Sequence, residues 1–103
     1  MALPTLTPEQ RQDALRKAAA ARTVRKELLE AIARGEQTVP AVLERAKTDT
    51  VVGRTKVVAL LKSVPGYGPA KATALLERAG ITPSRRAGGL GHRQRQMLTD
   101  ALR

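Results

Sequence analysis

Residues 60–102 read LLKSVPGYGPAKATALLERAGITPSRRAGGLGHRQRQMLTDAL, and this stretch decides the predicted fold. It holds two segments of helical periodicity, each preceded by a loop rich in glycine: Pro65–Pro69 before the first and Arg85–Gly91 before the second. Backbone amides at a helix start, flanked by cations, form a natural site for phosphate. The sequence therefore indicates helices whose ends bind an anionic partner.

Helical patterns also account for the rest of the chain, and no segment alternates apolar and polar residues as a half-buried strand would. Thr7, Pro8 and Gln10 form a capping-box start for a long first helix, which Gly35 ends. The predicted helices are Pro8–Arg34, Val39–Lys47 capped by Thr38, Lys56–Ser63, Pro69–Ala79, and a last one from Gly91 or His92 to Leu102. The fold class is therefore all-α, with a break or fresh cap at residues 48–50 and no clear pattern around Gly53.

Apolar residues at helical spacing give each predicted helix one face that turns inward. In chain order these residues are Ala21, Val24, Leu28 and Ile32; Val42, Leu43 and Ala46; Val57, Leu60, Leu61 and Val64; Ala72, Leu75, Leu76 and Ala79; and Met97, Leu98, Ala101 and Leu102. The inward face of the first helix is confined to its C-terminal half. We therefore expect residues 1–35 to be a partly projecting N-terminal helix and residues 36–103 to be a compact helical domain.

Composition narrows the class of protein further. The 103 residues include one aromatic side chain, Tyr67, and no cysteine, so the core must be aliphatic and neither disulfides nor thiolate metal sites can form. The first five residues lack the features of a signal peptide, and no apolar stretch could span a bilayer. We expect a cytoplasmic protein with no membrane partner, no small-molecule substrate, no metal and no cofactor.

Positive charge is concentrated in the second half of the chain. Residues 51–103 contain ten Lys and Arg against two acids, whereas residues 1–50 contain nine against seven, and the formal net charge is +10. Such a balance favours a polyanionic partner, and nucleic acid suits loops that offer several phosphate sites. Anionic membrane surfaces usually require a strongly apolar helix face, which is missing. On the first helix, Arg11, Arg22 and Lys26 form either a solvated face or an auxiliary contact with DNA.

The first glycine loop combines a tight turn with a cationic helix start. Gly66 and Gly68 permit positive φ and leave room for a phosphate, Pro69 presets the first helical turn, and Lys71 adds a charge at the positive end of the helix dipole. The alternative is an ordinary turn between two packed helices. Tyr67 is either a packing residue or a group that lies against the nucleic acid.

The second glycine loop carries the densest group of arginines. Arg85, Arg86, Arg93 and Arg95 lie within eleven residues, and glycines between them keep the backbone thin enough to approach a duplex. The candidate contact residues here are Ser84, Arg85, Arg86, Gly89, Gly91, Arg93 and Gln94. The alternative is a solvated basic turn. His92 is expected to be a polar residue of the helix start.

Catalytic residues are not expected. One histidine, no cysteine and no close pair of carboxylates in an apolar setting leave few ways to assemble an acid–base or metal site.

Residues 60–102 as quoted above resemble the helix–two-turns–helix module of formamidopyrimidine-DNA glycosylases and of a small-subunit ribosomal protein. The shared pattern is a Gly-x-Gly turn, a helix ending in Ala-Gly-Ile, a basic loop with proline, and a closing helix. Together with the N-terminal MALPTLTPEQRQDALRKAAAARTVRKELLEAI, the whole chain resembles the actinobacterial integration host factor family. The glycosylases' proline nucleophile has no counterpart, because position 2 is Ala2, so base excision is not implied.

The resemblance implies a nucleoid-associated protein, with residues 64–71 as a lid-like segment that contacts DNA and residues 82–94 as the DNA-binding turn. Phosphate contacts carry no base identity, so we expect binding to double-stranded DNA with little sequence preference, although Arg93, Gln94 and Gln96 leave some base contact open. The expected protein is a monomer, whose two loops would grip one duplex or bridge two. An RNA-binding or ribosome-associated protein is the alternative.

Overall fold

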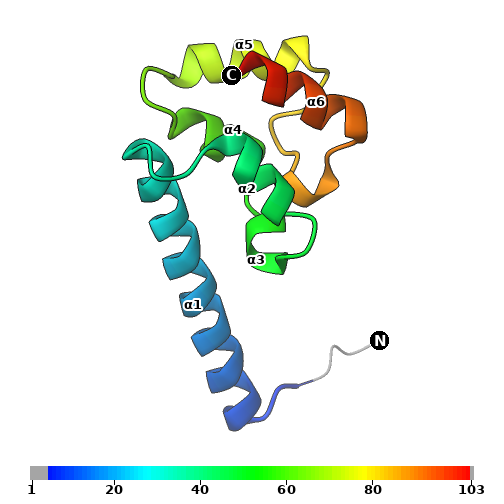
Figure 1. The fold of residues 1–103 in the computed structure, drawn as a ribbon. Coiled ribbons are helices and arrows are strands. Elements are labelled where there is room, and N and C mark those ends of the chain that lie inside the picture. The colour runs from blue at the N-terminus through cyan, green and yellow to red at the C-terminus, as the bar shows by residue number, and fades with distance from the viewer. Residues whose placement is uncertain (1–4, 103) are drawn as a thin grey trace.

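A long helix, α1 (Pro8–Ala33), extends from a cluster of short helices in the computed structural model, which describes residues 5–102 (Figure 1). The cluster consists of α2 (Val39–Arg45), α3 (Thr50–Gly53), α4 (Val57–Lys62), α5 (Pro69–Arg78), the 3₁₀ turn η1 (Ala87–Gly89) and α6 (His92–Ala101). No strand occurs within residues 5–102, where one β-bridge pairs Lys56 with Arg86. The all-α prediction is confirmed, with helix ends within two residues of those predicted.

Local signals account for the ends of α1. The Gln10 amide donates to Thr7 Oγ1 (3.1 Å) and the Thr7 amide donates to Gln10 Oε1 (3.0 Å), which completes the predicted capping box. At the other end Gly35 takes a φ of +77°, a conformation that glycine adopts without the clash of a Cβ. Every side chain from residue 8 to residue 20 is exposed, so the first half of α1 projects from the cluster.

The inward face of α1 differs from the prediction at one position. Leu28 and Ile32 are buried, but Val24 is 38% exposed. The helix packs against α3 and α4, and the face that meets them passes through Arg25 and Leu29, which are both partly buried. Val24 lies beside that face and is wrongly placed in the core by the sequence pattern.

The aliphatic core lies between the short helices. Its fully buried side chains come from every helix of the cluster: Val42 and Leu43 from α2, Val52 from α3, Val57, Leu60 and Leu61 from α4, Ala72 and Leu76 from α5, Ala87 from η1 and Leu98 from α6. Removing apolar surface from water is the dominant stabilising term in folding. Because this core has no aromatic residue, the stabilisation comes from many close aliphatic contacts.

The α5 helix ends in a Schellman motif. The Ile81 amide donates to the Leu76 carbonyl (2.9 Å), the Gly80 amide donates to the Glu77 carbonyl (3.1 Å), and Gly80 takes a φ of +69°. Ile81 is 4% exposed and packs into the core.

The last helix buries less than its sequence pattern indicates. Leu98 is fully buried and Leu102 is half-buried, whereas Met97 is 45% exposed and Ala101 is also exposed. The stripe of Leu98 and Leu102 is covered by the rest of the cluster, with α6 packing against α2. Met97 and Ala101 form the adjacent stripe, which has no covering element among the described residues, so the prediction that both are buried is wrong.

The predictions for the first five residues, including Ala2, fall almost wholly outside the described residues, because residues 1–4 are not among them. The predicted unit 1–35 begins, and the predicted unit 36–103 ends, at residues that are also outside the described part of the chain. The boundary between the two units at residue 35 stays a prediction. Within residues 5–102, no helix is both long enough and apolar enough to cross a membrane.

Candidate nucleic-acid interface

The first glycine loop exposes the start of α5. Gly66 takes a φ of +86° and turns the chain, and Gly68 is the N-cap of α5 with no side chain bonded to the helix start. The first hydrogen bond of the helix runs from the Ala72 amide to the Gly68 carbonyl (3.0 Å). The amides of Ala70 and Lys71 are therefore among the donors that the first turn of a helix leaves open to a ligand.

Tyr67 and Lys71 form a contact beside these amides. Lys71 Nζ lies 4.6 Å from the centroid of the Tyr67 ring, and the tyrosine is partly buried against the core. Tyr67 therefore packs against the core, and a cation lies over its ring. A cation over an aromatic ring is attracted by the ring quadrupole, which offsets the cost of placing Lys71 at the positive end of the helix dipole. Pro69 is exposed at the first helical position, as expected.

The second glycine loop is held by the link between α3 and α4. The Val57 amide donates to the Arg85 carbonyl (3.1 Å) and the Ala87 amide donates to the Thr55 carbonyl (2.9 Å). Ala87 is fully buried, and a Cβ on Gly88 would lie 3.1 Å from the Gly53 carbonyl oxygen. This loop therefore includes a turn, η1, that packs into the core.

The two adjacent arginines of this loop have different environments. Arg86 Nη1 donates a short hydrogen bond to the Arg54 carbonyl, so the Arg86 guanidinium is fixed on the α3–α4 link. Arg85 is exposed, and its side chain passes over Gly89, where a Cβ would lie 3.4 Å from the arginine Cδ. The Arg85 side chain has no hydrogen bond or ion pair among the described residues and is free to contact a ligand. Ser84 and Arg93 are exposed on either side of it.

Gln94, a candidate contact residue, is hydrogen-bonded within the protein. Its Oε1 accepts from the Gly91 amide (3.0 Å), and its Nε2 donates to the Gly80 carbonyl (3.0 Å). The side chain thus joins the end of α5 to the start of α6. Both polar atoms of the Gln94 side chain are hydrogen-bonded within the protein, and so is the Gly91 amide.

The structure does not bring the two glycine loops together. They flank α5, whose ten residues span about 15 Å at 1.5 Å per residue, and they lie at opposite ends of that helix (Figure 1). The predicted site residues therefore form two separate surfaces. The first comprises Gly66, Tyr67, Gly68, Pro69 and Lys71, and the second comprises Ser84, Arg85, Arg86, Gly89, Gly91, Arg93 and Gln94.

Four further basic residues lie beside these surfaces. They do not belong to a common sequence motif. Arg78 lines a hollow with Tyr67 and Lys71, on the exposed side of α5. Arg25, Arg54 and Lys56 line another hollow with Arg86. Arg78 is seven residues from Lys71, and this helical spacing could have found it. The other three come from α1 and from the α3–α4 link, and only the packing of those elements places them together.

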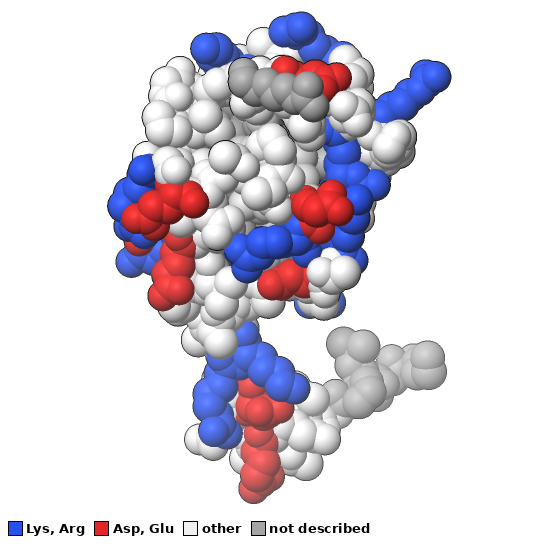
Figure 2. All heavy atoms as spheres, in the orientation of Figure 1, with Lys and Arg blue, Asp and Glu red and all other residues white. Residues whose placement is uncertain are grey.

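Ion pairs join four cations of the first half of the chain, Lys17, Arg34, Arg45 and Lys47, to acidic side chains, and none of the described cations of the second half is in an ion pair. The ion pairs within residues 5–102 all precede residue 50: Asp13–Lys17, Glu30–Arg34, Arg34–Glu36, Arg45–Asp49 and Glu44–Lys47. The hydrogen bond and the charge of Glu36 raise the pKa of Arg34. Figure 2 shows red and blue side chains side by side along α1, while uncharged residues occupy the middle of the visible face of the cluster.

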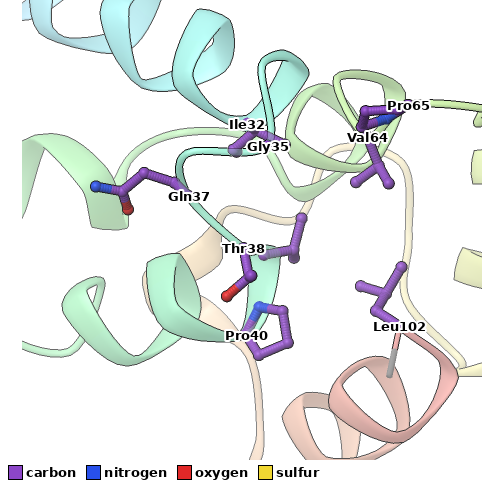
Figure 3. Close-up of a pocket in the computed structure, with 9 residues that line it drawn as sticks. Ile32, Gly35, Gln37, Thr38, Pro40, Val64, Pro65 and Leu102 are labelled. Atoms are coloured by element: carbon purple, nitrogen blue, oxygen red, sulfur yellow. The ribbon is translucent and has the colours of Figure 1, made fainter.

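An apolar pocket lies next to the first loop but lacks the chemistry of a phosphate site. It has a volume of about 180 Å³ between the end of α1, the start of α2 and residues Val64 and Pro65. Figure 3 shows its lining, which includes Ile32, Pro40 and Leu102 and no ionisable side chain. The charged surfaces described above are therefore the candidates for binding an anion.

Comparison with known proteins identifies the family of the chain. The model of the S13-like H2TH domain family matches residues 32–102. The integration host factor of Mycolicibacterium smegmatis is 49% identical over 100 residues, which cover 97% of this chain and 95% of that protein. The integration host factor of Streptomyces coelicolor is 47% identical over 94 residues, which cover 91% of this chain and 88% of that protein.

A solved structure has a similar fold and contains DNA. It is described as the structure of sIHF bound to an 8-bp palindromic DNA, and it matches 85% of this chain and 99% of its own with a TM-score of 0.83 and 38% identity. The chain therefore belongs to the integration host factor family, and its residues 32–102 match the S13-like H2TH domain.

Proposed function

We propose that this protein is a nucleoid-associated protein that binds double-stranded DNA through phosphate contacts with little sequence preference. The observation that carries the proposal is the pair of unneutralised cationic surfaces at the two ends of α5, one of them at a helix start with open amides. The similar solved structure contains bound DNA, which supports DNA as the polyanion. The protein acts in the cytoplasm on chromosomal DNA and has no catalytic role.

Low sequence preference follows from the kinds of groups that the surfaces offer. Backbone amides, Lys71 and Arg85 suit phosphate oxygens, which position a protein on DNA but carry no base identity. Gln94, the side chain best suited to read an adenine, is held by Gly80 and Gly91.

A monomer with contact surfaces at both ends of α5 is suited to bridge two duplexes or to hold one bent duplex. We propose bridging as the means by which the protein compacts DNA. Electron microscopy of saturated DNA should then show linked duplexes, and a population of single, unlinked duplexes would contradict bridging.

The test of DNA binding is a titration of a random 20-bp duplex over a range of salt concentrations. About five neutralised phosphates would give a slope of log K against log salt of about −4 to −5. A flat response would contradict the proposal, and matched duplex RNA that competes as well as DNA would favour the RNA-binding alternative. Arg85→Gln should weaken binding equally on random and AT-rich duplexes, and Lys71→Gln should do the same at the other surface.

Arg85 is a cleaner probe than the pair Arg85 and Arg86. The guanidinium of Arg86 donates to the Arg54 carbonyl, so its removal also disturbs the α3–α4 link. A double substitution would mix loss of a contact with loss of structure.

A further inference from the structure

One hollow, beside α1, is lined by cations from three parts of the chain. Arg25 comes from the middle of α1, Arg54 and Lys56 come from the α3–α4 link, and Arg86 comes from the second glycine loop. Its volume is about 420 Å³, and its remaining lining residues are the uncharged Leu29, Thr55 and Ala59. We name it the Arg25 hollow.

No acid balances these four charges. The lining contains no Asp or Glu, and within residues 5–102 none of the four side chains is in an ion pair. Like charges around a shared hollow repel one another, and the attraction of each cation to an anion placed between them would offset that repulsion. The electrostatic free energy of this cluster is therefore lower when an anion is bound than when the hollow is empty.

The Arg86 guanidinium is already held in position to bind an anion. The bond from Arg86 Nη1 to the Arg54 carbonyl uses one of the five N–H donors of the guanidinium and fixes its position. The β-bridge between Lys56 and Arg86 fixes the backbone at two of the four positions. Arg25 is partly buried, since α1 packs against α3 and α4 next to it.

We propose that the Arg25 hollow binds the sugar–phosphate backbone of the duplex that the second glycine loop holds, so that α1 is part of the DNA interface. Arg86 belongs to both surfaces, which makes them continuous. The hollow is too wide for a single buried anion and suits a chain of phosphates that passes across it. This inference rests on the proposed function and extends it from the second loop to the N-terminal helix.

The test compares variants of one charge each in the salt titration described above. Arg25→Gln and Arg54→Gln should each reduce the magnitude of the slope of log K against log salt by about 0.9, and the double variant by about 1.8. Arg54→Gln keeps the backbone carbonyl that Arg86 requires, and the Arg54 side chain is exposed. Thermal unfolding of each variant establishes that it is folded.

Arg16→Gln is the matched control. Arg16 is an exposed arginine of α1, nine residues before Arg25, and at about 100° per residue it lies on the opposite side of the helix. The slope of log K against log salt for Arg16→Gln should equal that of the wild type. Wild-type slopes for both Arg25→Gln and Arg54→Gln would overturn the inference, as would an equal reduction in Arg16→Gln.

Failure of this inference is distinct from failure of the proposed function. If Arg85→Gln weakens binding while both hollow variants bind as the wild type does, the second loop binds DNA without α1. If the wild type itself shows no salt-dependent binding, the proposed function fails and the inference fails with it.

Discussion

The two glycine loops of this protein use glycine for different physical reasons. In the first loop a Cβ on Gly66 or Gly68 would meet nothing within 4 Å, so these residues leave open space next to a helix start. In the second loop the backbone of Gly88 lies against that of Gly53, where a Cβ would be 3.2 Å from the Gly53 Cα. One loop is built for access and the other for close packing, although both are rich in glycine.

The difference also decides which cations are available to a ligand. Lys71 rests on the ring of Tyr67 beside open amides. In the second loop Arg85 is free, while Arg86 and Gln94 are bonded to backbone groups of the protein. A basic, glycine-rich stretch can therefore contain both contact residues and structural residues in close succession.

Gly88→Ala should have the largest effect on stability. The new methyl group would press on backbone atoms of Gly53, which cannot move aside as a flexible side chain would, and overpacking of this kind costs about 1–3 kcal/mol. Chemical denaturation measures the loss. Gly89→Ala is the control, because its Cβ would meet only the flexible side chain of Arg85 at 3.4 Å. Equal stability of the two variants would show that the second loop is not anchored through Gly88.

Gln94→Ala should have the next largest effect on stability, about 1–2 kcal/mol, because two backbone groups lose their partner. The affinity of the folded variant for DNA should remain that of the wild type. Gln96→Ala is the control, since its exposed bond to Asp100 is a helix-surface pair of a few tenths of a kcal/mol. A tenfold loss of DNA affinity in a folded Gln94→Ala protein would instead make Gln94 a contact residue.

Gly68→Asp should separate stability from binding at the first loop. An aspartate at this N-cap position has space and a suitable backbone conformation, and it should stabilise α5 by about 0.5 kcal/mol. The same carboxylate would occupy the open amides and repel phosphate, so DNA affinity should fall about tenfold. Thermal unfolding and duplex titration measure the two effects, and Gly68→Ser is the uncharged control. Unchanged affinity in Gly68→Asp would remove the first loop from the interface.

The fold could be predicted in detail where local signals act alone. The capping box of Thr7 and Gln10, the glycine C-caps and the apolar spacing of residues 57–61 depend on neighbours in the chain, and the structure agrees with each of them. Val24 and Met97 were misplaced because their exposure depends on which stripe of a helix meets a partner. An apolar residue at the right period can still lie beside the contact.

The candidate site could be predicted only in part for the same reason. The charge of the second half and its glycine loops point to a phosphate-binding protein from composition and spacing. The Arg25 hollow had no such signal, because Arg25 and Arg86 are 61 positions apart in the chain.

Alone, the amino-acid sequence determined every helix except α3 and η1, the unequal distribution of charge and the kind of partner that suits it, since propensity and net charge are properties of neighbouring residues. Tertiary structure decided which glycines provide access and which provide packing, which polar side chains are already bonded, and which distant cations share one hollow. These outcomes depend on how helices pack in three dimensions, and the position of a residue in the chain does not encode its distance from residues on other helices.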